Sequence, residues 1–113
     1  MRNNFLQRYE GSDLGNKPHI TILGSCKVGN FVVSIPLLRL IRQKYPKGII
    51  DFWGSEATRD FEEALSGNNQ PISWRCSWDI KAEENPFEKL LNFYIKREEE
   101  AGPIDLVINC DGF

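Results

Sequence analysis

Residues 19 to 45 read HITILGSCKVGNFVVSIPLLRLIRQKY, and this stretch decides the fold. It begins with an apolar run from Ile20, which predicts a buried β-strand. A loop of small residues starts at Gly24, and from about Asn30 apolar residues recur at helical spacing to the end of the stretch. The sequence therefore predicts a strand, a tight loop and a helix. In an open α/β sheet such a junction lies at the carboxyl end of a strand, where backbone N–H groups and the positive end of the helix dipole face a ligand.

The composition is that of an ordinary globular domain. The chain has 113 residues, of which 41% are hydrophobic and 27% are charged, and its net charge is −2. Nucleic-acid-binding domains are normally basic, so this balance gives no support to nucleic acid as a partner. No segment reaches the roughly 18 consecutive apolar residues of a membrane span, and the first residues lack the apolar core of a secretory signal. We therefore expect a cytoplasmic protein.

The first two thirds of the chain alternate between helix-like and strand-like segments. Residues 1–18 are polar and turn-forming, and we expect a leader outside the sheet or against its edge. Residues 49–53 are β-branched and aromatic, which predicts a second strand. A helix is expected over residues 55–65 with Ser55 as its N-cap. Residues 71–74 give a weaker third strand.

The last third predicts another helix and a fourth strand. Asn85, Pro86 and Glu88 have the spacing of an N-cap, a first helical residue and a capping-box acid, and the helix should run to about Glu100. Its expected buried stripe consists of Phe87, Leu90, Leu91, Tyr94 and Ile95. Residues 104–109 form the fourth strand. The alternation predicts an α/β fold, a Rossmann-like parallel sheet with helices on both faces and the strand order 3-2-1-4.

The loop after the first strand fits neither of two familiar phosphate-binding motifs. In a P-loop the second glycine is followed by Lys-Ser or Lys-Thr, whereas Gly29 is followed by Asn30. The dinucleotide fingerprint has a glycine where this chain has Cys26. Neither an NTPase nor a dehydrogenase is supported. The two glycines are explained either by a tight turn alone or by a backbone that binds an anion or a sugar hydroxyl.

The cysteines and the single histidine do not form a metal-binding pattern. Cys26, Cys76 and Cys110 lack ligand spacing and His19 stands apart from them, so we expect neither a metal site nor a disulfide framework. Cys26 lies near a helix N-terminus, where a thiolate is favoured. It is therefore either a reactive thiol or an ordinary reduced cysteine.

Three separated pieces of sequence resemble one known family. Residues 22–46, ILGSCKVGNFVVSIPLLRLIRQKYP, resemble the opening of glycosyltransferase family 9, the bacterial heptosyltransferases, with its strand, Gly-Asp loop, Thr-x-Pro-x-Leu run and basic helix ending near Tyr-Pro. The second strand also matches. Residues 105–113, DLVINCDGF, resemble the family's Tyr-Asp-x-x-Ile-Asp-x-x-Gly strand. The resemblance covers residues 19–113.

The resemblance implies both a fold and a reaction. Members of this family have two Rossmann-like domains of the GT-B type, the first for the acceptor and the second for the nucleotide-sugar donor, and they invert the transferred sugar. On this basis residues 19–113 are the first part of the acceptor-side domain. The donor is an ADP-heptose-like nucleotide sugar, and the acceptor is a lipopolysaccharide core or another glycan. The donor domain is missing, so we expect this chain alone to be inactive. No cofactor is implied, and membrane contact is at most peripheral, at the inner face.

Asn30 is where the chain departs from the family. The family places there the aspartate that deprotonates the acceptor hydroxyl, whereas an amide is no base, although it can hydrogen-bond a hydroxyl. Asp111 is the nearest substitute. Alternatively the chain is a non-catalytic sugar-binding or assembly module that keeps the fold. Asn30 itself either contacts the substrate or caps the helix. The acceptor-binding residues that the resemblance implies are Gly24, Ser25, Cys26, Lys27, Gly29, Asn30 and Gly112.

A basic run along and just after the first helix has two interpretations. It consists of Arg39, Arg42, Lys44 and Lys47. These residues either meet anionic lipid phosphates or form the solvated face of the helix.

Overall fold

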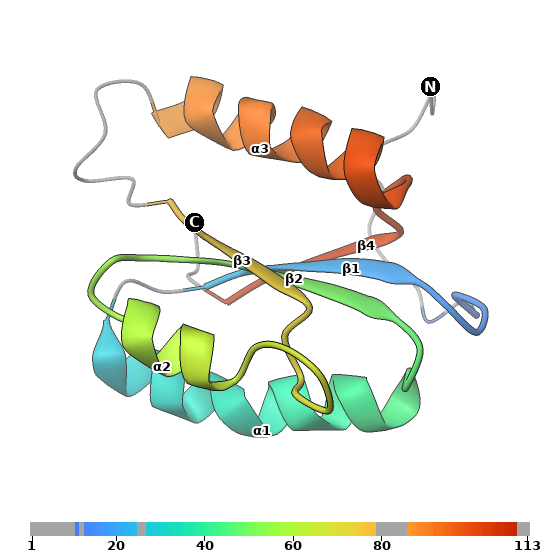
Figure 1. Ribbon diagram of the computed structural model, residues 1–113, viewed down its shortest axis with the longest axis horizontal. Coiled ribbons are helices and arrows are strands. Elements are labelled where there is room, and N and C mark those ends of the chain that lie inside the picture. Colours follow the sequence, from blue (N-terminus) through green and yellow to red (C-terminus); the bar gives the residue numbers. More distant parts are fainter. Residues whose placement is uncertain (1–10, 12, 25–26, 79–85, 111–113) are drawn as a thin grey trace.

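Figure 1 shows the computed structural model, which describes residues 11, 13–24, 27–78 and 86–110. Strands and helices alternate in the order β1 (His19–Leu23), α1 (Val28–Lys44), β2 (Ile49–Gly54), α2 (Arg59–Ala64), β3 (Trp74–Ser77), α3 (Pro86–Ala101) and β4 (Leu106–Asn109). Neighbouring strands pair in parallel, and the sheet order is β3-β2-β1-β4. α1 and α2 cover one face of the sheet, and α3 covers the other (Figure 1). The predicted α/β class, parallel sheet and strand order are therefore confirmed.

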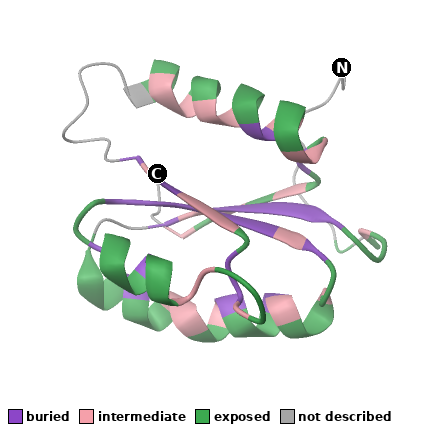
Figure 2. Cartoon of the chain, in the orientation of Figure 1, coloured by how far each residue is buried: buried purple, intermediate pink, exposed green. Residues whose placement is uncertain are grey.

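The face under α1 and α2 holds the apolar core. Its buried members are Ile20, Ile22, Ile50 and Phe52 from the strands, Phe31, Leu38 and Ile41 from α1, and Ile72. Phe31 packs edge-on against Phe52, with ring centroids 5.5 Å apart. β1 and β2 are buried along almost their whole length (Figure 2). This is expected of central strands in a parallel sheet that is covered on both faces.

The face under α3 is polar and aromatic. Asp51 of β2 is fully buried there and pairs with Arg97 of α3, and the Phe93 ring lies 6.2 Å from the Trp53 ring. The predicted buried stripe of α3 is therefore wrong in part, because Phe87, Leu91 and Ile95 are 68%, 56% and 47% exposed. A buried carboxylate needs a charged partner, so the helix turns Arg97 toward the sheet and its outer apolar residues away from it.

Two element boundaries also differ from the prediction. Thr58, not Ser55, is the N-cap of α2, and the buried Ser55 hydroxyl lies 3.0 Å from the Thr58 hydroxyl. β3 starts at Trp74, where the predicted third strand ends. Trp74 is the first residue in register with β2, opposite Asp51, although the Ser73 N–H before it already donates to the Ile50 carbonyl oxygen at 2.8 Å. α3 begins at Pro86 as predicted, and its expected cap, Asn85, lies outside the described residues.

Part of the predicted leader packs on the domain. Leu14 is partly buried and packs against the apolar core. Pro18 is fully buried, and its carbonyl oxygen accepts a hydrogen bond from the Ile49 N–H at 2.8 Å. Leu14 and Pro18, which precede β1, thus pack on the domain. Within the described ranges, no helix has the length and apolar character needed to cross a membrane.

Candidate functional site

The carboxyl ends of β1 and β4 lie side by side. Leu23 is in register with Asn109 at the last position of both strands. The Cys110 N–H donates to the Leu23 carbonyl oxygen at 2.9 Å. The segments that follow the two strands therefore leave the sheet at the same edge. Four of the predicted site residues, Ser25, Cys26, Asp111 and Gly112, lie outside the described residues, whereas Gly24, Lys27, Gly29 and Asn30 are described.

The two loop glycines differ in what they contact. Gly24 is buried, and its N–H donates to the Trp53 carbonyl oxygen at 2.9 Å. A Cβ added to Gly24 would lie 2.4 Å from Cζ of Phe52, closer than nonbonded carbon atoms approach. Gly29 is exposed within α1, and an added Cβ would meet no atom within 4 Å. Close packing on a phenyl ring thus accounts for Gly24 without a ligand, and it does not account for Gly29.

Asn30 lies in the first turn of α1. The helix begins at Val28, and its N-cap is Lys27, which has extended backbone angles (φ −97°, ψ 132°) and no side-chain capping hydrogen bond. The alternative in which Asn30 caps the helix is therefore wrong. Asn30 and Lys27 are both exposed at the positive end of the α1 dipole. Their side chains supply hydrogen-bond donors and a positive charge for a hydroxyl-rich or anionic ligand, but no general base.

A buried polar cluster at the carboxyl ends of β2 and β3 was not predicted from the sequence. Glu62 of α2 is fully buried. Its carboxylate accepts hydrogen bonds from the Ser55 N–H at 3.2 Å and from the Thr58 hydroxyl. Arg75 Nε donates to the other oxygen at 2.8 Å. Gly54 leaves the space that this carboxylate occupies, since an added Cβ would lie 2.0 Å from Glu62 Oε2. A carboxylate held by this many donors anchors α2 to the sheet.

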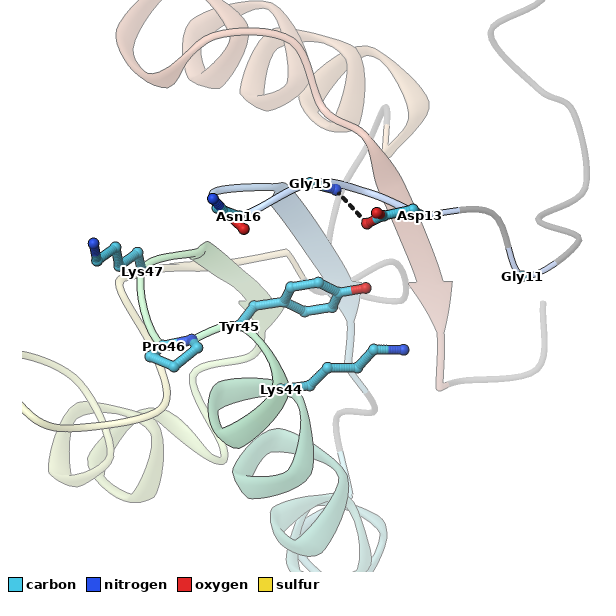
Figure 3. Close-up of a pocket in the computed structure, with 8 residues that line it drawn as sticks. All are labelled: Gly11, Asp13, Gly15, Asn16, Lys44, Tyr45, Pro46 and Lys47. Atoms are coloured by element: carbon cyan, nitrogen blue, oxygen red, sulfur yellow. Dashed lines mark hydrogen bonds between the residues drawn. The ribbon is translucent and has the colours of Figure 1, made fainter.

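A cavity of about 710 Å³ opens at the other end of the sheet (Figure 3). Its lining consists of Gly11, Asp13, Gly15, Asn16, Lys44, Tyr45, Pro46 and Lys47. These residues either precede β1 or join α1 to β2, so the cavity lies at the amino ends of the strands. Ligands of open parallel sheets bind at the carboxyl ends. The cavity is therefore separate from the predicted site.

The basic run is divided between two environments. Arg42 is half-buried, and its guanidinium donates to the carbonyl oxygens of Gly48 at 2.8 Å and Pro71 at 3.1 Å. It ties the end of α1 to the chain before β2 and β3, so both interpretations are wrong for this residue. The other three members, Arg39, Lys44 and Lys47, are exposed.

The described cysteines are free thiols and do not suggest redox or metal chemistry. Burial raises the pKa of Cys76 to about 12, and it also raises the pKa of the half-buried Cys110. Cys26 lies outside the described residues. Among the residues that the structure describes, no three His, Cys, Asp or Glu side chains come together as a metal site requires.

No protein-family model, curated protein or solved structure matches this chain. The residues themselves and the geometry of the sheet therefore carry the functional argument.

Proposed function

We propose that this chain is the acceptor-side half of an inverting glycosyltransferase similar to family 9, with an ADP-heptose-like donor and a lipopolysaccharide-core or other glycan acceptor. The observation that carries the proposal is the adjacency of β1 and β4 at their carboxyl ends, where the Cys110 N–H meets the Leu23 carbonyl. Two of the segments that resemble family 9, residues 22–46 and 105–113, contain the carboxyl ends of these strands. In open α/β sheets this edge, beside a helix N-terminus, is where ligands bind.

An exposed apolar residue on the edge strand β4 supports the view that the chain is one part of a larger domain. Val107 of β4 is about half exposed. Further strand and helix units packed beyond β4 would cover it.

A second exposed apolar residue is Leu91 of α3. It lies about 160° around the helix from Phe93, whose ring contacts Trp53 and Trp74 on the β3 side. Leu91 is more than half exposed. Further elements of the proposed larger GT-B domain would cover it. Such an enzyme works in the cytoplasm, at the inner membrane face where the acceptor is lipid-linked.

Asn30 favours a second candidate, a sugar-binding or assembly module that has kept the fold without the reaction. An exposed amide in the first turn of α1 can hydrogen-bond a hydroxyl, but it cannot remove its proton. Binding at the same edge of the sheet is common to both candidates. They differ in whether a base acts on the bound sugar.

The gene downstream of residue 113 and one substitution separate the candidates. For the transferase, a second Rossmann-like half with a nucleotide-sugar site should follow, and a stop codon at that point contradicts it. In the complete protein, Asn30→Asp should raise the transfer rate by about 10²-fold or more if only the base has been lost. If the wild type already transfers the sugar rapidly and Asn30→Asp leaves that rate unchanged, Asp111 is the expected base. If neither the wild type nor Asn30→Asp transfers sugar, although both bind it, the binding module is supported.

A further inference from the structure

The only histidine of the chain joins three elements under α3. His19 is 2% exposed at the start of β1, and its Nε2 lies 2.7 Å from Asp51 Oδ2 of β2. Its Nδ1 lies 2.9 Å from the carbonyl oxygen of Gly102, directly after α3. Arg97 donates two hydrogen bonds to the same Asp51 carboxylate, at 2.9 and 3.0 Å, and lies over the Trp74 ring.

Both neighbours of the imidazole ring are hydrogen-bond acceptors. A carbonyl oxygen only accepts, and an ionised carboxylate only accepts. The ring can satisfy both contacts only if both nitrogens carry a proton, which makes it an imidazolium. Burial by itself lowers the pKa of His19, but the hydrogen bonds to Asp51 and Gly102 outweigh it, and the pKa is raised.

Loss of the proton breaks one of these contacts. A neutral ring has a single N–H, so its other nitrogen would direct a lone pair at an oxygen less than 3 Å away. The charged Asp51 retains the N–H, because a hydrogen bond to a carboxylate is stronger than one to a neutral carbonyl. Gly102 therefore loses its donor. It is the left-handed residue (φ 88°) whose N–H closes the last turn of α3 on the Glu98 carbonyl at 3.0 Å.

The charged groups around the ring come from three segments. Asp51 belongs to β2, and Arg97 of α3 lies between it and Glu100, whose carboxylate is 3.8 Å from Arg97 Nη1. Glu98 Oε2 accepts a hydrogen bond from the Ile104 N–H at 2.5 Å. Asp105 Oδ2 accepts one from the His19 backbone N–H at 2.9 Å. Among these side chains histidine is the one whose charge ordinarily changes between pH 5 and 8.

We propose that His19, Asp51 and Gly102 form a pH-sensitive latch, which holds the carboxyl end of α3 on the sheet while His19 is protonated and releases it when the proton leaves. The latch lies at the amino end of β1 and does not depend on the sugar site. Because the folded state binds the proton more tightly than the unfolded chain, its contribution to stability is complete below about pH 6.5 and is lost as pH rises through the His19 midpoint.

NMR of the wild-type chain tests the latch without ambiguity of assignment, since there is one histidine. The His19 ring should titrate with a midpoint above 6.5. Amide exchange at residues 98–102, corrected for its intrinsic pH dependence, should become about five- to tenfold faster across that midpoint. Exchange in α1, on the other face, should not change with it. A midpoint at or below 6.5, or constant exchange at residues 98–102, overturns the proposal.

Two variants separate a latch from a merely buried histidine. Asp51→Asn removes the charge that favours the imidazolium, so the His19 midpoint should fall and the change in exchange should move with it. His19→Gln cannot titrate, so exchange at residues 98–102 should be fast and independent of pH. Exchange that still changes near the wild-type midpoint in His19→Gln contradicts the latch. If this variant does not fold, the coupled shift in Asp51→Asn remains the test.

Discussion

Gly24→Ala and Gly29→Ala should change stability in opposite directions, although both glycines belong to one short motif. A Cβ at residue 24 would lie 2.4 and 2.6 Å from two atoms of the Phe52 ring. That ring is fully buried and packs edge-on against Phe31, so it has no room to retreat. The Gly24 backbone is itself held by Trp53. Overpacking costs about 1–3 kcal/mol, and we expect about 2–3 kcal/mol here because neither side of the contact can move.

Alanine at residue 29 has the opposite effect. Gly29 lies inside α1, and an added Cβ would have no neighbour within 4 Å. Glycine in a helix is less favourable than alanine by roughly 0.8–1.0 kcal/mol. Because helix ends fray, we expect a gain of about 0.5 kcal/mol at this position in the first turn.

Urea titrations followed by tryptophan fluorescence and circular dichroism measure both effects. At roughly 4 °C per kcal/mol for a chain of this size, Gly24→Ala should lower Tm by about 8–12 °C and Gly29→Ala should raise it by about 2 °C. A Gly24→Ala variant as stable as the wild type would refute the packing account of the β1–α1 junction. Destabilisation by Gly29→Ala of about 1 kcal/mol or more would show that this glycine has a role that the packing does not reveal.

The buried polar groups give three more predictions. Arg42→Met leaves several carbonyl oxygens without their donor and should lower the free energy of unfolding by about 2–4 kcal/mol. Arg39→Met is the matched control, because Arg39 is exposed on the same helix, and it should change the free energy of unfolding little. Equal effects of the two substitutions in a urea titration would contradict the structural role of Arg42. Glu62→Gln should cost about 3 kcal/mol or more, because it leaves the Arg75 guanidinium, on a side chain only 13% exposed, without its buried carboxylate partner. The exposed Glu63→Gln should have little effect. With a pKa of about 12, roughly 10⁻⁴ of Cys76 is thiolate at pH 8, so iodoacetamide should label it only on unfolding, and fast labelling of the native chain would show that the thiol is not buried.

Three of the four strands and the strand order could be predicted from the sequence because the signals are local, whereas the third strand was predicted too early, at residues 71–74. Four apolar runs bounded by turn residues mark the strands, and right-handed crossovers leave few ways to order them. The orientation of α3 could not be predicted in this way. Its sequence is compatible with a face through Leu91 and Ile95 or with one through Phe93 and Arg97. Asp51, 46 residues from Arg97, decides between them, and no local pattern reports such a pairing.

At the candidate site, sequence reasoning located the junction but not its details. The glycines and the apolar run correctly placed a loop between β1 and α1. The start of the helix was predicted at about Asn30, because apolar residues recur at helical spacing from there. The helix instead begins earlier, after Lys27, without a side-chain cap. The contact of Gly24 with Phe52 joins residues far apart in the sequence, so the packing role of that glycine became visible only in the folded structure.

We propose that the carboxyl edge formed by β1 and β4 binds a sugar acceptor. Titration of the ¹⁵N-labelled chain with a heptose-containing lipopolysaccharide-core oligosaccharide tests it most directly, with ADP-heptose and NADH as comparison ligands. If the acceptor binds at this edge, amide shifts should concentrate at residues 24–30 and 109–112, and binding should be weaker in Asn30→Ala. ADP-heptose and NADH should cause no comparable shifts. Shifts confined to the cavity around Tyr45, or a response to NADH and not to the oligosaccharide, would contradict it.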